Sequence, residues 1–118
     1  MSVSQGANPP IELTLDSPNP TANMVIACII GGVHNCQYTP GPRIRAFRVN
    51  IESALNSSQV DEIRGGLDEP EGLLKKQYKA LVTSFEYFGR TDKPGGQLTL
   101  IIDTDASDLV LNPAPMPT

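Results

Sequence analysis

The chain has 118 residues, of which 39% are hydrophobic, and its formal net charge is −4 at pH 7. A chain of this length normally forms one domain and buries enough apolar surface to fold without a metal or a disulfide framework. The acidic balance disfavours nucleic-acid binding as the primary function, because nucleic-acid binders usually carry a basic excess.

The N-terminal third predicts an arm followed by three strands. Residues 1–10 are mostly small and polar and end in two prolines, which is typical of an extended segment. Apolar and polar residues alternate over 11–15, the pattern of a half-buried strand. The continuous apolar run 24–30 predicts a central strand buried on both faces. The glycine pair that follows predicts a turn into a returning strand at 33–39.

The middle of the chain predicts a strand and then a short helix. Apolar and polar side chains divide cleanly between the two faces of a strand over 43–51. Ser57 or Ser58 then provides an N-cap for a helix. We expect this helix to end at the glycine pair Gly65-Gly66.

A longer helix is predicted next. Its apolar residues recur at alternating spacings of four and three: Leu74, Tyr78, Leu81, Phe85 and Phe88. That spacing places them on one stripe of a helix. Pro70 suits the first turn and Gly89 suits the end, so the helix would be about nineteen residues, or roughly 28 Å, long.

The C-terminal part predicts a turn over 92–96, a strand over 97–103, and a short edge strand over 109–111. Together the elements predict an α+β fold, with a small, mostly antiparallel sheet of about four or five strands. One long amphipathic helix and one short helix would cover this sheet. The domain would span 11–111, between extended Pro-rich arms at 1–10 and 112–118.

Cys28, His34 and Cys36 are the soft metal ligands closest in sequence. Three such ligands would suit a catalytic zinc ion, and Cys36 with His34, two apart on one strand face, would suit nucleophilic catalysis. The chain has no Cys-x-x-Cys pair and no identifiable third group to orient the imidazole. A two-residue turn keeps the two cysteines apart, whereas a three-residue loop sets them opposite each other. We expect free thiols, no metal, no cofactor and no catalytic residues.

Residues 103–108 begin like a calcium-binding loop, with oxygen ligands at alternate positions. The sixth position is Asp108 instead of glycine, and the twelfth is Ala114 instead of glutamate. The segment therefore predicts a strand end whose side chains bond to their own backbone in a turn.

Arg43, Arg45 and Arg48 are the candidate site residues, three cations within six residues of an acidic chain. Strand alternation places Arg43 and Arg45 on one face and Arg48 on the other. One interpretation is a solvated or ion-paired strand. The other is a charged contact with a neighbouring subunit or with nucleic acid.

The most informative functional feature is the placement of charge. Residues 1–42 contain no Lys or Arg, and their only acidic residues are Glu12 and Asp16. Soluble monomers scatter charges of both signs over their surface, so we expect this third to be covered by the fold or by another subunit. With its arms, the layout resembles that of small structural proteins of virus particles.

We therefore expect a non-enzymatic structural subunit, such as a coat, cement or tail component of a virion. It would self-associate or bind neighbouring structural subunits through its charge-poor N-terminal third and arms. Nucleic acid is a less favoured partner, and a membrane is not expected. Because the N-terminus has no signal-peptide pattern, we expect the chain in the cytoplasm or within an assembled particle. The alternative is a small acidic soluble regulator that binds a larger protein.

Overall fold

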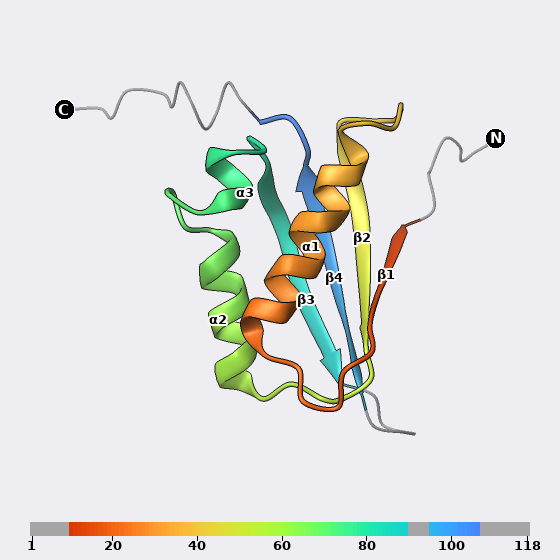
Figure 1. Cartoon of the computed structure of the whole chain (residues 1–118), viewed down its shortest axis with the longest axis vertical. Helices are drawn as coiled ribbons and strands as arrows, with labels where there is room; N and C mark the ends of the chain where they lie inside the picture. Colours follow the sequence, from red (N-terminus) through yellow and green to blue (C-terminus); the bar gives the residue numbers. More distant parts are fainter. Residues whose placement is uncertain (1–9, 90–94, 107–118) are drawn as a thin grey trace.

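The computed structural model describes residues 10–89 and 95–106 and shows an α+β fold built on a four-stranded mixed sheet (Figure 1). The predicted fold class is therefore confirmed. The strands are β1 (Ile11–Leu15), β2 (Ile44–Ile51), β3 (Leu81–Gly89) and β4 (Gly96–Asp103), and the helices are α1 (Ala22–Cys36), α2 (Ser57–Leu67) and α3 (Leu73–Lys76). The strand order is β1-β2-β4-β3, in which β1 and β2 are parallel and the other two pairings are antiparallel.

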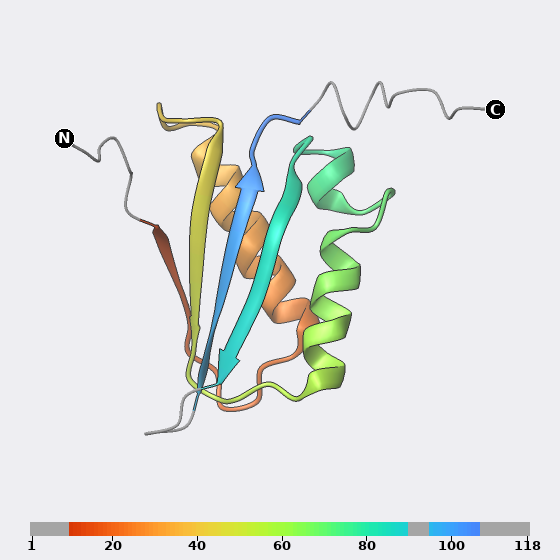
Figure 2. The same cartoon turned by 180° about the vertical axis from the view of Figure 1, so that it is seen from behind.

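The helices cover only one face of the sheet. Figure 1 shows α1 in front of the strands and α2 beside the β3 edge, and Figure 2 shows the opposite face with no helix over it. Alternate residues of the two central strands are buried toward the helices: Phe47, Val49, Ile51, Leu98, Leu100 and Ile102. This is the period-two pattern that the sequence predicts for both strands. We call the uncovered side the open sheet face.

The short helix α2 lies close to its predicted position. Its N-cap is Asn56, one residue before the predicted Ser57, and the Asn56 side chain accepts the Gln59 N–H at 2.8 Å. The Gln59 side chain accepts the Asn56 N–H in return, at 3.0 Å. The helix continues past the predicted stop at Gly65-Gly66, because Leu67 is buried in the core and two helical glycines cost only about 1 kcal/mol each.

The two strands predicted at 24–30 and 33–39 are wrong, because one helix, α1, covers the first and continues into the second as far as Cys36. The Thr21 side chain caps this helix by accepting the Met24 N–H at 3.2 Å. The buried residues recur at helical spacing: Ala22, Val25, Ile29, Gly32, Val33 and Cys36. Gly32 is not a turn residue. A Cβ at this position would lie 3.0 Å from Leu13 and 3.3 Å from Phe47, so glycine lets the helix lie close to the sheet.

The long helix predicted to start near Pro70 and to end at Gly89 is also wrong. Helix α3 ends after four residues, and Lys79 then adopts a positive φ of 53°. The Ala80 N–H donates to the Leu74 carbonyl at 3.1 Å, which closes the helix in the left-handed manner usual for glycine. The chain continues as β3. Phe88, placed on the predicted apolar stripe, is 52% exposed on the open sheet face.

The remaining predictions fall largely outside the described residues. The arm predicted at 1–10 is described only at Pro10, and the arm at 112–118 is not described. The predicted edge strand at 109–111 and most of the predicted turn at 92–96 also lie outside the described ranges.

Candidate functional site

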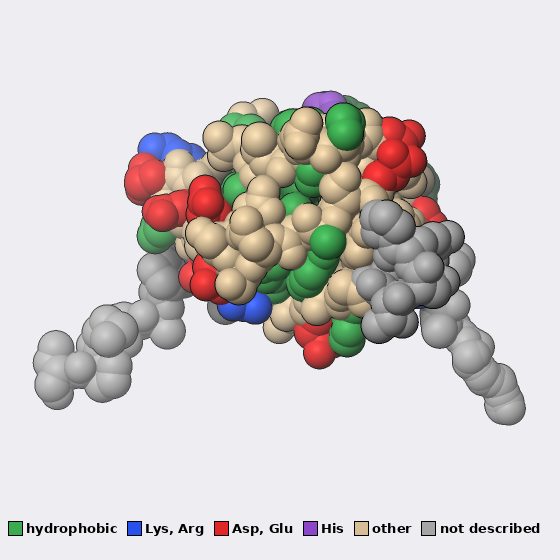
Figure 3. All heavy atoms as spheres, turned by 90° about the horizontal axis from the view of Figure 1, so that it is seen from below, with side chains coloured by type: hydrophobic (Ala, Val, Ile, Leu, Met, Phe, Trp, Pro, Cys, Tyr) green, Lys and Arg blue, Asp and Glu red, His purple; other side chains and the backbone are tan. Residues whose placement is uncertain are grey.

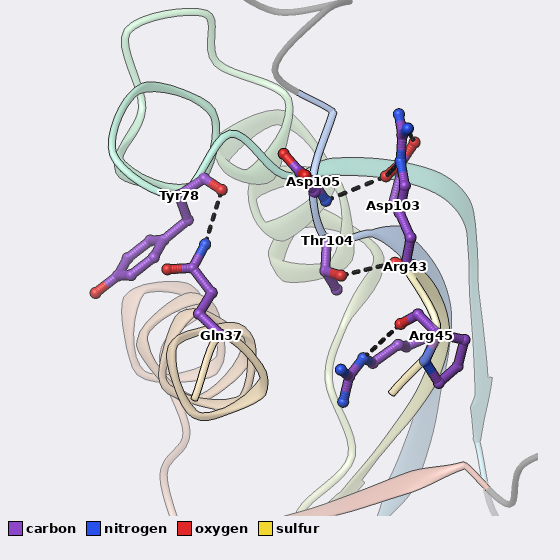
Figure 4. Close-up of polar contacts among 8 residues, drawn as sticks. Gln37, Arg43, Arg45, Tyr78, Asp103, Thr104 and Asp105 are labelled. Atoms are coloured by element: carbon purple, nitrogen blue, oxygen red, sulfur yellow. Dashed lines mark hydrogen bonds and ion pairs between the residues drawn. The ribbon is translucent and has the colours of Figure 1, made fainter. Parts of the chain in front are cut away.

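Arg43, the first of the three candidate arginines, is bound to the end of β4 (Figure 4). Its guanidinium donates to both carboxylate oxygens of Asp103, at 2.7 and 3.0 Å. The Asp103 side chain is only 8% exposed, and the hydrogen bond from Arg43 lowers the pKa of this carboxyl below its ordinary value. The Arg43 carbonyl also accepts the Thr104 hydroxyl at 2.7 Å. This arginine therefore joins the start of β2 to the end of β4.

Arg45 donates hydrogen bonds to backbone carbonyls at and just after the end of α1. Its Nη2 donates to the Thr39 carbonyl at 3.0 Å and approaches the Cys36 carbonyl at 3.4 Å, while Nε donates to the Pro42 carbonyl at 2.8 Å. A cation at this position satisfies carbonyls that the helix leaves unpaired and interacts favourably with the helix dipole. Two of the three guanidinium nitrogens of Arg45, Nε and Nη2, therefore donate to its own chain.

Arg48 lies apart from the other two arginines, on the open sheet face. Its Nη1 donates to Glu12 on β1 at 2.8 Å, and Asn50 donates to the same carboxylate at 2.8 Å. The Asn50 amide oxygen in turn accepts from Gln97 at 3.0 Å. The Nε of Arg48 is buried and has no acceptor among the described residues. The three arginines thus do not converge on one site, and a charged contact with a neighbour stays a prediction.

The cysteine and histidine chemistry weighed against the expectation of free thiols depends on strands that do not form. Cys28, His34 and Cys36 all lie on α1, and both cysteines are free thiols. Two residues apart on a helix, His34 and Cys36 point to different sides, and Cys36 is buried while His34 is exposed. Burial raises the pKa of the Cys28 thiol, which makes it a poorer nucleophile. The described residues contain no metal-binding group of three or more His, Cys, Asp or Glu side chains.

The segment that begins like a calcium loop is occupied by protein contacts instead. Asp103 binds Arg43 and also accepts the Asp105 N–H at 3.1 Å. This is the predicted turn in which a side chain bonds to nearby backbone. Ser107, Asp108 and Ala114 lie outside the described ranges.

An aromatic cluster, not expected from the sequence, forms where α1 ends. His34 contacts the edges of two tyrosine rings, Tyr38 at 5.1 Å and Tyr78 at 5.6 Å between ring centroids. The Tyr78 hydroxyl lies 3.1 Å from Nδ1 of His34. Gln37 donates to the Tyr78 carbonyl at 3.0 Å (Figure 4). These contacts tie the end of α1 to the segment before β3, across 44 residues of sequence.

A hollow lies between α2 and the β3 edge, with a volume of about 550 Å³. The charged side chains that line it form ion pairs within the chain. Arg64 binds Asp61 at 3.4 Å, and its guanidinium lies 4.9 Å above the Phe85 ring. This hollow therefore presents no unpaired cation to a ligand.

The surface of α1 turned away from the sheet carries no Asp, Glu, Lys or Arg side chain. We call it the α1 outer face, and its exposed residues are Asn23, Met24, Ala27, Gly31, His34 and Asn35. Tyr38, just beyond the helix, extends this surface and is 77% exposed. Seen from its lower end in Figure 3, the surface beside the histidine shows apolar and uncharged groups, with the acidic side chains to either side.

Comparisons with known proteins assign no family to this chain. No family model, no curated protein and no solved structure matches it. None of the helices in the described part of the chain has both the length and the apolar character needed to cross a membrane.

Proposed function

We propose that the chain is a non-enzymatic structural subunit that assembles with copies of itself or with neighbouring structural subunits. The α1 outer face would be its main contact. A small coat, cement or tail component of a virion fits this role, and the chain would act in such a particle or in the cytoplasm where the particle assembles.

The single observation that supports this proposal is the exposed, charge-free surface of α1. The sheet covers one side of the helix, so the fold accounts for only part of the charge-poor N-terminal third. The other side extends for roughly 22 Å along fifteen residues without a charged group. Soluble surfaces usually interleave charges at this scale, and depletion of charge is typical of the centre of an interface.

The chemistry of the α1 outer face suits packing against another helix. Ala27 and Gly31 lie one turn apart in its middle, and a Cβ at Gly31 would meet no atom within 4 Å. Small side chains at this spacing let a second backbone approach closely. Met24 and Tyr38 flank them and provide apolar contact area.

Introducing a charge into this face tests the proposal. In sedimentation velocity, we expect the weight-average sedimentation coefficient of the wild type to rise with protein concentration. Ala27→Glu should raise the dissociation constant by about tenfold or more, because a carboxylate would have to be buried in the contact. Glutamate is a good helix former, so this variant should keep the fold.

Ser58→Glu is the matched control, because it adds the same charge at an exposed position in the first turn of α2. It should associate like the wild type. A wild-type chain that stays a monomer at the highest concentrations would refute self-association. If such a monomer instead captured one stoichiometric partner from its native host, the acidic-regulator alternative would be supported.

A further inference from the structure

The open sheet face contains a polar row that runs across all four strands. Backbone register aligns Glu12 with Arg48, Arg48 with Thr99, and Thr99 with Glu86. Since side chains at paired positions point to the same side of a sheet, the four form one line: acid, base, hydroxyl, acid. Only its first two members are joined, by the ion pair between Arg48 and Glu12 at 2.8 Å.

The row has an unsatisfied group on each side of Thr99. On one side, Nε of Arg48 is a buried donor with no acceptor among the described residues. A buried donor that is left unpaired destabilises the fold. On the other side, Glu86 is exposed and makes no ion pair with any described residue. Among the described residues, the face therefore carries a partly exposed guanidinium with one unsatisfied donor and one carboxylate without a cation.

The surface around this row can admit the side chains of a partner. A hollow of about 220 Å³ lies over it, and the lining includes Arg48, Glu86 and the small residues Ala46 and Ser84. Apolar side chains flank the row: Ile44 is 52% exposed, Ile101 is 41% exposed and Phe88 is 52% exposed. A polar centre with an apolar surround is therefore presented on a face that no helix covers (Figure 2).

We propose that the open sheet face binds the open sheet face of a second copy of this chain. Arg48 and Glu86 lie one strand to either side of Thr99, each about 4.8 Å away. A two-fold axis over Thr99, parallel to β4, exchanges these positions, so Arg48 of each copy faces Glu86 of the other. Packed sheets lie about 10 Å apart, a gap that an arginine and a glutamate span together. This inference rests on the proposed self-assembly and adds a second contact to it.

Charge composition favours a second copy over the other occupants. Residues 1–9 contain no charged residue, and 107–118 contain Asp108 but no base. Neither terminal segment contains both a carboxylate side chain for Arg48 and a basic side chain for Glu86. Nucleic acid is disfavoured as well, because the row has two carboxylates and one guanidinium, and the phosphate backbone attracts a net positive surface.

Single substitutions on the face provide the first part of the test, in the full chain by sedimentation velocity. Glu86→Arg places arginines opposite each other twice in the symmetric pair, and should weaken this contact by about tenfold or more. Ile101→Asp lies on β4 next to the axis and brings two carboxylates together, with the same expected effect. Glu62→Arg, an equal charge change at an exposed position on α2, is the control and should behave as the wild type.

Mixing complementary variants is the second part. Arg48→Glu chains have two acids at the contact and Glu86→Arg chains have two bases, so each should self-associate weakly through this face. Their mixture pairs every acid with a base and should recover the lost association. Circular dichroism checks that Arg48→Glu folds. If it does not, the two exposed variants, Glu86→Arg and Ile101→Asp, decide the question.

The outcomes separate this inference from the proposed function. If Glu86→Arg and Ile101→Asp associate like the control while Ala27→Glu does not, the sheet contact is refuted and self-assembly stands. If the wild type never associates, the sheet contact and self-assembly are both refuted, and of the proposed function only binding to other structural subunits stands. Tighter association of a chain that lacks residues 1–9 would mean that the N-terminal segment occupies the face, and would also overturn the sheet contact.

Discussion

At the scale of single residues, the arginines divide into those whose described contacts hold the fold together and one with a buried unsatisfied donor. Arg43 and Arg45 have acceptors within the chain, on Asp103 and on the carbonyls that follow α1. Arg48 is different, because its Nε is buried and has no acceptor among the described residues. The sequence groups the three arginines as one site, but their surroundings give them three separate roles.

The Arg43–Asp103 pair predicts a pH dependence of stability. Because the pair lowers the pKa of Asp103, its stabilisation is present above the unfolded pKa of about 3.8 and is lost as pH falls through the lower folded value. Asp103→Asn should lower the free energy of unfolding by about 1–2 kcal/mol at pH 7. In urea titrations, the curves of variant and wild type should converge as the pH falls below that range.

Asp61→Asn is the comparison for this experiment. Asp61 binds Arg64 at 3.4 Å, and both side chains are more than half exposed. Exposed pairs of this kind contribute little, so we expect a loss below about 0.5 kcal/mol. A gap between Asp103→Asn and the wild type that persisted at acid pH would show that shape, and not charge, makes Asp103 important.

At the scale of elements, the helical structure of α1 determines which side chains of the N-terminal third are buried and which are exposed. Its apolar run and glycine pair match a buried hairpin as well as a helix, since short apolar runs do not distinguish the two by period. Continued over fifteen residues, however, the segment buries one stripe on the sheet and exposes the other. A buried hairpin would have covered both faces of this segment, whereas the helix leaves the side turned away from the sheet exposed.

The two adjacent glycines of α1 predict opposite effects of substitution. Gly31→Ala should raise the free energy of unfolding by about 0.5–1 kcal/mol, because the position is open and alanine favours a helix. Gly32→Val should lower it by about 1–3 kcal/mol, because the added atoms meet Leu13 and Phe47. Thermal denaturation in dilute solution measures both. Destabilisation by both substitutions would contradict the helix and favour a glycine turn.

At the scale of the whole molecule, the two proposed contact surfaces lie on opposite sides. Figures 1 and 2 show α1 on one side of the sheet and the open sheet face on the other. Two self-contacts with separate axes do not close into a dimer, and they continue into chains or lattices. This geometry suits a subunit that builds an extended structure.

The combination of variants tests this arrangement. The wild type should grow beyond dimers as its concentration rises. Ala27→Glu and Glu86→Arg should each stop at small species held by the remaining contact, and the double variant should be a monomer in light scattering. If either single variant alone were fully monomeric, only one contact would exist and assembly would be a closed pair.

Much of the sheet could be predicted from sequence, and the interacting surfaces could not. The strands at 11–15, 44–51 and 96–103 keep a period of two because one face of the sheet is open and favours polar residues. Strand β3 escaped prediction because its aromatic residues fall by coincidence at helical spacing. The boundary before it is set by the backbone of Lys79, whose positive φ no periodicity indicates.

The sequence by itself determined the α+β class, three of the four strands, the short helix α2, and the shortage of charge in the N-terminal third, because these follow from composition and local alternation. Only the tertiary structure decided that α1 is a helix with an uncovered side, and that Glu12, Arg48, Thr99 and Glu86 form one row. The physical reason is that register joins residues far apart in the chain. The neighbours of Arg48 depend on which strands pair with β2, and no local sequence pattern predicts that pairing.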